Sequence, residues 1–288
     1  MLELFAQQVL NGLSMGMGYV LVALGLTLVF GVLHIVNFSH GELYMLGGFV
    51  ALLSVRVFGL PYAAAVLLAL VAVAAAAWVI DAVAVRPIMT KPEGRDTVML
   101  STYAVGLLLF DAVLVSWGTA PQRVPGFSGT LEFLNLTLTM QRGAVLLIGA
   151  VMLGLTWFVL NHTLFGKRMR AVAENAFAAQ VVGIPIRRIG TTTFVIAGAL
   201  AGMAGALLVP VSLFTPHIGQ NVIIKGFVVV VIGGMGSVLG ATVAGLALGI
   251  LEALGSIYIP AGFNLALIYA ALLAILLIRP QGLFSRGR

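Results

Sequence analysis

Long apolar stretches separated by short polar interruptions dominate the chain and predict its architecture. A helix needs about 20 apolar residues to cross the hydrocarbon core of a bilayer. We predict membrane segments at 9–31, 41–58, 61–84, 97–117, 143–163, 191–214, 226–258 and 264–279. The stretches lack the short alternating pattern of membrane β-strands. We therefore expect an all-α fold: a polytopic transmembrane helix bundle of about eight membrane segments, forming a single domain over residues 1–288.

Two of these segments are interrupted, one near 31–42 by polar residues and one near 232–240 by glycines. Non-helical backbone at membrane depth is tolerated only where protein buries it or where it lines a wet cavity. Paired interruptions in the two halves of a chain indicate a transporter pathway. We expect broken or half helices at both places. The candidates for lining the pathway are Asn37, Ser39, His40, Glu42, Gly233, Gly234 and Gly236.

Each interruption also has a simpler interpretation. Residues 32–40 fit a tight polar turn at the membrane surface. The glycines near 232–240, like Gly198, Gly202 and Gly205, have the spacing that lets helices pack closely in lipid. Glu42 has two possible roles: hydrogen bonding to backbone groups of the broken segment, or contact with a substrate ammonium. The sequence leaves these alternatives open.

Composition excludes several classes of protein. The chain is 61% hydrophobic and only 8% charged, against about 25% charged residues in a typical soluble domain. A soluble enzyme, a disordered chain and a nucleic-acid-binding domain are therefore excluded. The absence of cysteine excludes a disulfide framework and a cysteine-ligated metal site.

Lysine and arginine in short loops predict the orientation in the membrane. Arg56, Arg123, Arg142 and Lys225 are assigned to the outer side. The other basic residues fall in three regions that we place in the cytoplasm: Arg86, Lys91, Arg95, Lys167, Arg168, Arg170, Arg187, Arg188, Arg279, Arg286 and Arg288. We expect the C-terminus to lie in the cytoplasm.

The first residues carry no basic n-region of a signal peptide, so we expect the first segment to be retained.

Residues 165–190 form the most informative polar loop. Met169, Val172 and Val182 lie near one face of a predicted short amphipathic helix. Gly183 followed by Pro185 predicts the end of this helix, since glycine suits the left-handed position beyond a helix and proline cannot continue it. The helix fits either the lipid surface or a docking site for a cytoplasmic partner.

No catalytic, cofactor-binding or metal-binding constellation is recognisable. The chain has no GxxxxGK[ST] phosphate-binding motif and no HExxH motif. Asp81 is expected to reach Arg86 or the membrane interface, and Asp111 and Glu252 are expected to be paired or packed between helices rather than to bind a ligand. The two histidines of the first interruption, His34 and His40, are expected to hydrogen-bond nearby carbonyls.

Several motifs resemble the LivH-type permease family of branched-chain amino acid ABC importers. The run GLTLVFGVLHIVNFSHGELYMLGGF (residues 25–49) carries the most specific part of the resemblance. The stretch RAVAENAFAAQVVGI (residues 170–184) is similar to the loop of that family that contacts the ATPase. IGGMGSVLGATVAGLALGILEAL and the later RPQGLF match its C-terminal signature, so the resemblance covers essentially the whole chain.

The resemblance implies a transport subunit of the bacterial inner membrane, not an enzyme, with ATP bound and hydrolysed by partner subunits. The implied partners are a second related permease, cytoplasmic ABC ATPases, a periplasmic substrate-binding protein and membrane lipid, but no nucleic acid. The ATPase-coupling residues it implies are Arg170, Glu174, Asn175, Ala179, Gly183 and Ile184. A urea or short-amide permease of the same family, and a secondary transporter driven by an ion gradient, remain the alternatives.

Overall fold

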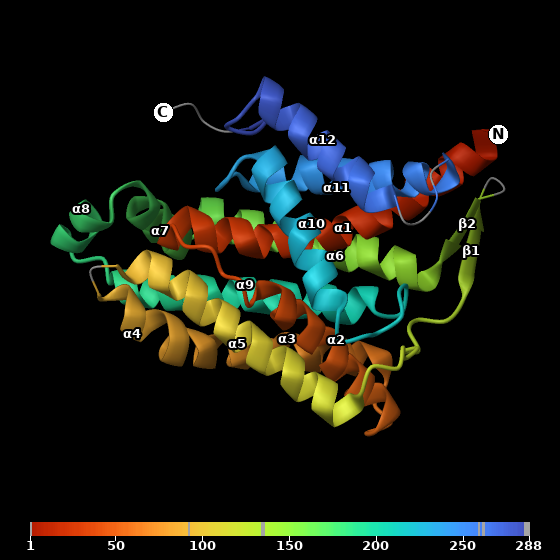
Figure 1. Ribbon diagram of the computed structural model, residues 1–288, viewed down its shortest axis with the longest axis horizontal. Coiled ribbons are helices and arrows are strands. Elements are labelled where there is room, and N and C mark those ends of the chain that lie inside the picture. The colour runs from red at the N-terminus through yellow and green to blue at the C-terminus, as the bar shows by residue number, and fades with distance from the viewer. Residues whose placement is uncertain (1, 92, 134–135, 259, 261–262, 285–288) are drawn as a thin grey trace.

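The computed structural model describes every residue except 1, 92, 134–135, 259, 261–262 and 285–288 (Figure 1). Its elements, in chain order, are α1 (Leu2–Leu33), α2 (His40–Arg56), α3 (Tyr62–Ile80), the π-helical turn η1 (Asp81–Val85), α4 (Arg86–Met89), α5 (Gly94–Trp117), β1 (Thr130–Phe133), β2 (Leu136–Thr139), α6 (Met140–His162), α7 (Leu164–Glu174), α8 (Ala176–Val181), α9 (Ile186–Leu208), α10 (Ile218–Gly233), α11 (Val238–Tyr258) and α12 (Asn264–Ile278).

The predicted helix bundle is confirmed. Within the described residues, six helices are long and apolar enough to cross a membrane: α1, α3 with its continuation to Met89, α5, α6, α9 and α11. Two shorter apolar helices, α10 and α12, pack against α11. The 17-residue α2 is mostly buried, so it is an inner helix of the bundle.

The bundle has two distinct ends (Figure 1). One end carries α4, α7 and α8, and the other carries the β1–β2 hairpin and the start of α1; we call them the α8 end and the hairpin end. Two of the predicted cytoplasmic clusters lie on elements of the α8 end: Arg86, Lys91, Arg95, Lys167, Arg168, Arg170, Arg187 and Arg188. Arg286 and Arg288 lie outside the described residues.

Close backbone contacts hold the centre together. Helix α9 packs against both α1 and α2, and small residues allow the backbones of α2 and α9 to approach closely. A Cβ atom built on Gly205 of α9 would overlap the carbonyl oxygen of Tyr44 of α2, and one on Gly47 of α2 would overlap Gly202 of α9. The packing role considered for the α9 glycines is therefore observed.

Four boundaries differ from the sequence prediction. Between the segments predicted to end at 117 and to begin at 143, the chain forms an antiparallel hairpin in which Thr130 pairs with Thr139. The segment predicted at 191–214 ends at Leu208, and the one predicted at 226–258 begins earlier, at Ile218. Its predicted break near 232–240 is confirmed, because α10 ends at Gly233 and α11 begins at Val238. The amphipathic helix of the 165–190 loop is divided at Asn175, because that side chain caps a new helix.

Candidate translocation site and coupling surface

The first interruption lies deep inside the bundle. The His40 Nε2 atom at the start of α2 donates a hydrogen bond to the carbonyl oxygen of Val22 in α1, at 3.1 Å. Val22 precedes the end of α1 at Leu33 by 11 residues, which is about 16 Å of helix. The chain therefore turns back into the bundle before α2 begins. The interpretation as a polar turn at the surface is wrong, and the broken segment is confirmed.

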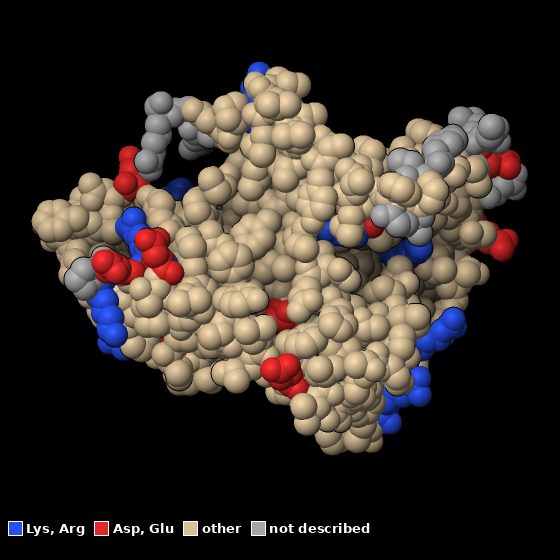
Figure 2. Space-filling view, viewed as in Figure 1, with Lys and Arg blue, Asp and Glu red and all other residues tan. Residues whose placement is uncertain are grey.

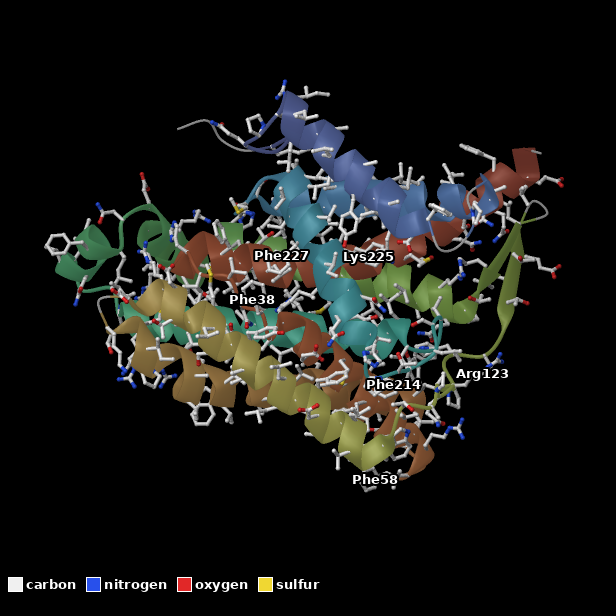
Figure 3. The ribbon with its side chains drawn as sticks, in the orientation of Figure 1. Phe38, Phe58, Arg123, Phe214, Lys225 and Phe227 are labelled. Carbon is white, nitrogen blue, oxygen red and sulfur yellow. The ribbon has the colours of Figure 1, made fainter. Side chains whose placement is uncertain are left out.

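Short polar contacts fix this turn. The Asn37 Oδ1 atom accepts hydrogen bonds from the backbone N–H of Ser39 at 3.0 Å and from its hydroxyl at 2.7 Å. The Phe38 N–H donates to the hydroxyl of Thr102 in α5, and the Phe38 ring lies 5.9 Å from that of Phe227 in α10 (Figure 3). The turn is thus held by α5 and α10 as well as by its own side chains.

The two histidines of the turn differ from each other. His40 is fully buried, and its bond to a carbonyl is the one expected from the sequence. His34 is exposed, adopts a positive φ of 53°, and contacts the Phe30 ring rather than a carbonyl. Among the described residues no hydrogen bond of the His34 ring to a carbonyl occurs, so the expectation of a carbonyl partner is wrong for His34.

Glu42 lies in the first turn of α2, where a helix N-terminus favours a negative charge. The residue is only 7% exposed, and its Oε2 atom has no hydrogen-bond partner within the described structure. A Cβ built on Gly219 of α10 would lie 2.8 Å from this oxygen, and one on Gly106 of α5 would lie 3.5 Å from Glu42 Cγ. The carboxylate therefore sits among α2, α5 and α10 with unused hydrogen-bonding capacity.

The second interruption is closed by later parts of the chain. Gly234 and Gly236 adopt positive φ angles of 98° and 86°, which end α10 and reverse the chain into α11. A Cβ on Gly233 would lie 2.5 Å from the Gly240 carbonyl oxygen. The Leu283 and Phe284 N–H groups donate to the carbonyls of Ile232 and Gly233 at 2.8 and 3.2 Å. These bonds satisfy the last carbonyls of α10.

The two interruptions meet. A Cβ added to Gly31 of α1 would lie 3.4 Å from the Cα atom of Gly236. The end of α1 and the turn between α10 and α11 are therefore in backbone contact.

Most charges inside the bundle are paired. Arg86 Nη2 lies 2.7 Å from Asp81 Oδ2, as the sequence predicts, and both side chains also contact the Thr191 hydroxyl. Lys225, which the sequence analysis assigned to an outer loop, lies inside α10 and pairs with Glu252 of α11. The expected pairing of Glu252 is confirmed.

Asp111 of α5 differs from these acids. It is exposed, and no ion pair or hydrogen bond of its side chain occurs among the residues that the structure covers. The expectation of a paired or packed side chain is wrong, because Asp111 faces away from the other helices of its own chain.

The polar loop at the α8 end forms a defined surface. The Asn175 side chain accepts from the Ala178 N–H at 2.9 Å and so begins α8. At the other end, the Ile184 N–H donates to the Ala179 carbonyl and the Gly183 N–H to the Gln180 carbonyl, both at 3.0 Å. This is a Schellman motif. With the φ of 83° at Gly183, it confirms the predicted helix end.

One side of this surface packs against the bundle, and the other side exposes apolar side chains. Ala179 is buried, and the Arg170 guanidinium donates to the carbonyl of Leu160 at the end of α6. Three large side chains of α8 and its cap point outward: Phe177, Val181 and Val182 are 78%, 72% and 75% exposed. Exposed apolar groups beside basic residues are typical of an interaction site.

A pocket joins α7 to the end of α1. It has a volume of about 350 Å³ and is lined by Glu174, Arg95 and His34 together with apolar side chains such as Val32 and Val172. Glu174 of α7 is therefore on the same cavity as His34, the residue from which the chain enters the first interruption. A movement of α7 has a direct structural route to that interruption.

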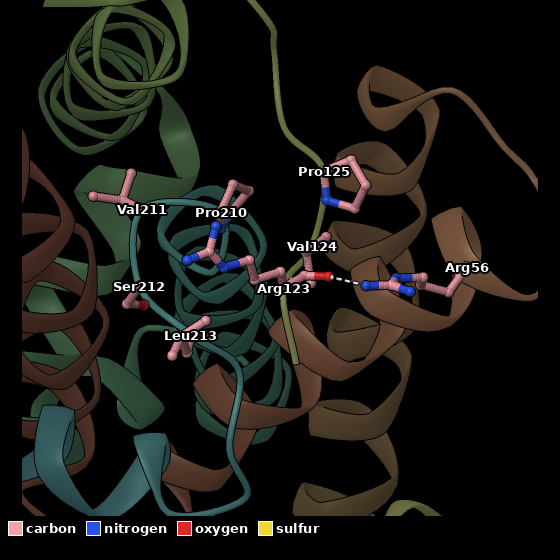
Figure 4. Close-up of a pocket in the computed structure, with 8 residues that line it drawn as sticks. All are labelled: Arg56, Arg123, Val124, Pro125, Pro210, Val211, Ser212 and Leu213. Atoms are coloured by element: carbon pink, nitrogen blue, oxygen red, sulfur yellow. Dashed lines mark hydrogen bonds between the residues drawn. The ribbon is translucent and has the colours of Figure 1, made fainter. Parts of the chain in front are cut away.

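A second pocket opens at the hairpin end (Figure 4). Its volume is about 590 Å³, and its lining includes Arg56, Arg123 and the segment 210–213. The Arg56 Nη2 atom donates to the Arg123 carbonyl at 2.9 Å. Both arginines are assigned to the outer side by the sequence analysis, and the structure brings them to one pocket although they lie far apart in the chain.

Comparisons with known proteins agree with this architecture. The family model described as "Branched-chain amino acid transport system / permease component" matches residues 8–277. The chain is 33% identical to the high-affinity branched-chain amino acid transport system permease protein LivH of Escherichia coli K12, over 98% of this chain and 96% of that protein. It is 32% identical to LivH of Salmonella typhimurium and to the corresponding permease BraD of Pseudomonas aeruginosa, over the same shares of the chains.

The family match spans nearly the whole bundle, including both interruptions and the α7–α8 loop. The relatives are named as transport permeases, in agreement with a multi-pass membrane protein that has a transport role. The chain therefore belongs to the family of permease components of branched-chain amino acid transport systems.

Proposed function

We propose that this chain is the transmembrane permease subunit of an ABC importer that moves branched-chain amino acids into the cytoplasm. The observation that carries the proposal is the α8 surface, an exposed apolar tip at the basic end of a membrane bundle of this family. Partner ATPase subunits supply the energy. The permease itself needs no cofactor, catalytic residue or metal.

The α8 surface fits an ATPase better than it fits lipid. Phe177 and Val181 lie on a short helix at the far extremity of the α8 end (Figure 1), and Gly183 and Asn175 fix the two ends of that helix. A helix that lies on a bilayer is expected to run along the headgroup plane beside the membrane helices. A capped, projecting helix instead suits insertion into a cleft of a cytoplasmic protein.

Coupling would pass from this surface to the first interruption. We assign Arg170, Glu174, Asn175, Ala179, Gly183 and Ile184 to the coupling loop. When the ATPases close, they would push α8 and α7, and Glu174 would move against the pocket that contains His34 and Val32. The contact between Gly31 and Gly236 would carry the shift to the second interruption.

Asn37, Ser39, His40 and Glu42 are the proposed pathway residues of the first interruption. The unused Oε2 atom of Glu42 favours the substrate ammonium over the structural role, since a purely structural carboxylate would use its buried oxygen. Gly233, Gly234 and Gly236 are proposed as the hinge that forms part of the pathway wall.

The proposed assembly contains this chain and a second related permease in the bacterial inner membrane, with the C-terminus cytoplasmic. Two cytoplasmic ATPases dock at the α8 end, and a periplasmic binding protein delivers substrate at the hairpin end. The basic residues of α7, of the α4–α5 connection and of the first turn of α9 support this orientation. A urea or short-amide substrate is the alternative within the family.

Uptake by the purified complex in proteoliposomes tests the proposal. We expect labelled leucine to accumulate only when ATP and the binding protein are both present. ATPase activity without leucine uptake would contradict a branched-chain amino acid as the substrate and would favour urea or an amide. Uptake driven by an ion gradient without ATP would contradict the ABC mechanism.

A further inference from the structure

The pocket that joins α7 to the end of α1 lies where four helices end or begin, and we call it the α7 pocket. Helix α1 ends at Leu33 and α7 at Glu174, whereas α5 begins at Gly94 and α9 at Ile186. Leu33, Glu174, Ile186 and Arg95 of α5 all line the pocket. Its volume of about 350 Å³ is at the lower end of the range for small-molecule sites, about 300–1,000 Å³. The α7 pocket therefore has room for a small solute.

Two charges of opposite sign stand at this pocket. Glu174 is the last residue of α7, where a helix is partially negative, and Arg95 is the second residue of α5, where a helix is partially positive. Each side chain thus repeats the sign of its own helix end instead of compensating it. Both residues are exposed, and neither side chain forms an ion pair or a hydrogen bond within the residues that the structure describes. Both charges are therefore available to a ligand in the pocket.

Apolar side chains form the buried part of the pocket. Val32 and Val172 are buried, and Leu33, Met89 and Ile186 are partly buried. Figure 2 shows acidic and basic side chains next to one another at the α8 end of the molecule. The α7 pocket therefore combines an apolar floor with a positive and a negative group at its rim.

This combination selects among small solutes by charge. A zwitterionic amino acid presents a carboxylate to Arg95 and an ammonium to Glu174, and each contact is a charge-assisted hydrogen bond. An aliphatic side chain buries its apolar surface against Val32 and Val172. A simple anion is repelled by the Glu174 carboxylate, a simple cation is repelled by the Arg95 guanidinium, and urea or a short amide has no charge for either. The pocket therefore fits an aliphatic amino acid best.

We propose that the α7 pocket is a second binding site, at which a free aliphatic amino acid binds from the cytoplasm with its carboxylate at Arg95 and its ammonium at Glu174. This inference rests on the proposed function, which places the α8 end in the cytoplasm and makes such an amino acid the released product. The site is separate from the proposed pathway at Glu42, since none of the proposed pathway residues lines it.

An occupied α7 pocket opposes the coupling movement. In the proposed cycle, closure of the ATPases moves Glu174 against this pocket, so the space for the ligand shrinks. A ligand that binds only the open pocket shifts the equilibrium away from the closed form. The released product therefore slows its own import, and by thermodynamic linkage closure of the ATPases weakens the binding of the product.

Binding of labelled leucine to the assembled complex in nanodiscs, without the binding protein, tests the site. We expect saturable binding of leucine. Leucinamide lacks the carboxylate and 4-methylpentanoate lacks the ammonium, so each should compete at least about fivefold more weakly than leucine, as for the loss of one partly exposed ion pair. Equal competition by either analogue, or no saturable binding of leucine, would overturn the proposal.

Two variants, each with a matched control, locate the bound leucine. Arg95→Gln removes the partner of the carboxylate, and Lys91→Gln removes another exposed basic charge, just before α5 and outside the pocket. Ala173→Leu fills the pocket, and Ala178→Leu adds the same atoms on α8 outside it. We expect Arg95→Gln to bind leucine at least about fivefold more weakly and Ala173→Leu to lose saturable binding, while both controls bind like the unmodified chain. Unchanged binding by either variant, or an equal loss in its control, would overturn the proposal.

A non-hydrolysable ATP analogue, which holds the ATPases closed, tests the link to coupling. We expect the analogue to weaken the binding of leucine to the complex about fivefold or more. Unchanged or tighter binding would show that closure does not compress the pocket, and would overturn the proposed inhibition.

These readouts separate this site from the proposed function, because none of them measures transport. Leucine that binds at Arg95 but is not taken up would contradict the proposed substrate and leave the site in place. Uptake of leucine without any binding that depends on Arg95 would leave the proposed function in place and overturn the site.

Discussion

Lys225 of α10 and Glu252 of α11 form an ion pair within the helix bundle, with Nζ 2.6 Å from Oε1. Tyr19 of α1 completes the group, since its hydroxyl donates to Glu252 Oε2 at 2.7 Å and accepts from Lys225 Nζ at 3.0 Å. The three residues connect three helices, α1, α10 and α11. Each charge is therefore compensated within the chain, in contrast to Asp111.

Removal of one partner of this pair should be more damaging than removal of both. Lys225→Met leaves the Glu252 carboxylate without its cation, and we expect the free energy of unfolding to fall by about 3 kcal/mol. The double variant Lys225→Met, Glu252→Leu should recover most of that loss, because no charge is left without a partner. Thermal unfolding midpoints in detergent check both. A single variant as stable as the unmodified chain would show that water already solvates the pair.

The contact between α2 and α9 should tolerate no added methyl group. Gly205→Ala places a Cβ against the Tyr44 carbonyl, and we expect a loss of about 2 kcal/mol from the forced separation of the two helices. Gly154→Ala is the control, because a Cβ there meets no atom within 4 Å. Equal thermal midpoints for the two variants would mean that α2 and α9 can move apart without a loss of stability.

Changes in the α8 surface should uncouple ATP hydrolysis from transport without preventing membrane insertion. Gly183→Val puts a branched side chain at a φ of 83°, a strain of about 1–2 kcal/mol, and so disrupts the end of α8. Glu174→Arg reverses the charge beside the pocket that includes Arg95. The measurement is the amount of leucine transported per ATP hydrolysed, which we expect to fall about tenfold.

Conservative variants serve as the controls for this coupling. Gly183→Asn should retain activity, because asparagine tolerates the left-handed conformation. Glu174→Gln keeps the size of the side chain without reversing its charge. If Gly183→Val and Glu174→Arg transport normally in complexes of normal abundance, α8 is not the coupling element.

The second interruption gives a further prediction. Gly234→Leu forces a side chain onto a φ of 98° and against Gly282, whose own Cβ would lie only 2.6 Å from Gly234 Cα. The docked segment 282–284 must then move, and we expect uptake to be strongly impaired. Gly154→Leu, on the open side of α6, should have uptake close to normal. Unchanged uptake by Gly234→Leu would exclude a tightly packed hinge.

The helices were predictable from the sequence because membrane segments depend on local composition. Apolar length alone identifies α3, α5 and α6, and the positive φ of Gly183 follows from its own glycine and from Pro185 two residues later. The depth of the first interruption was not predictable. It depends on the contact between His40 and Val22, and no local pattern indicates how far a turn re-enters a bundle.

The acidic residues of the membrane segments likewise differ in whether their partners could be predicted from the sequence. Asp81 could be matched with Arg86 because they are five residues apart on continuous helix. The partner of Glu252 lies on another helix, and its identity required the tertiary structure. Asp111 was expected to be paired for the same physical reason, but its own chain offers no partner among the described residues.

The docking of residues 283–284 on the end of α10 has a consequence for biosynthesis. The carbonyls of Ile232 and Gly233 receive their donors from a part of the chain that leaves the ribosome only after α11 and α12. Until then the last two carbonyls of α10 lack these donors, and the turn between α10 and α11 is not yet held by the C-terminal segment. Completion of this membrane subunit is thus a late event, which a truncation before Gly282 should prevent even though every membrane helix has been made.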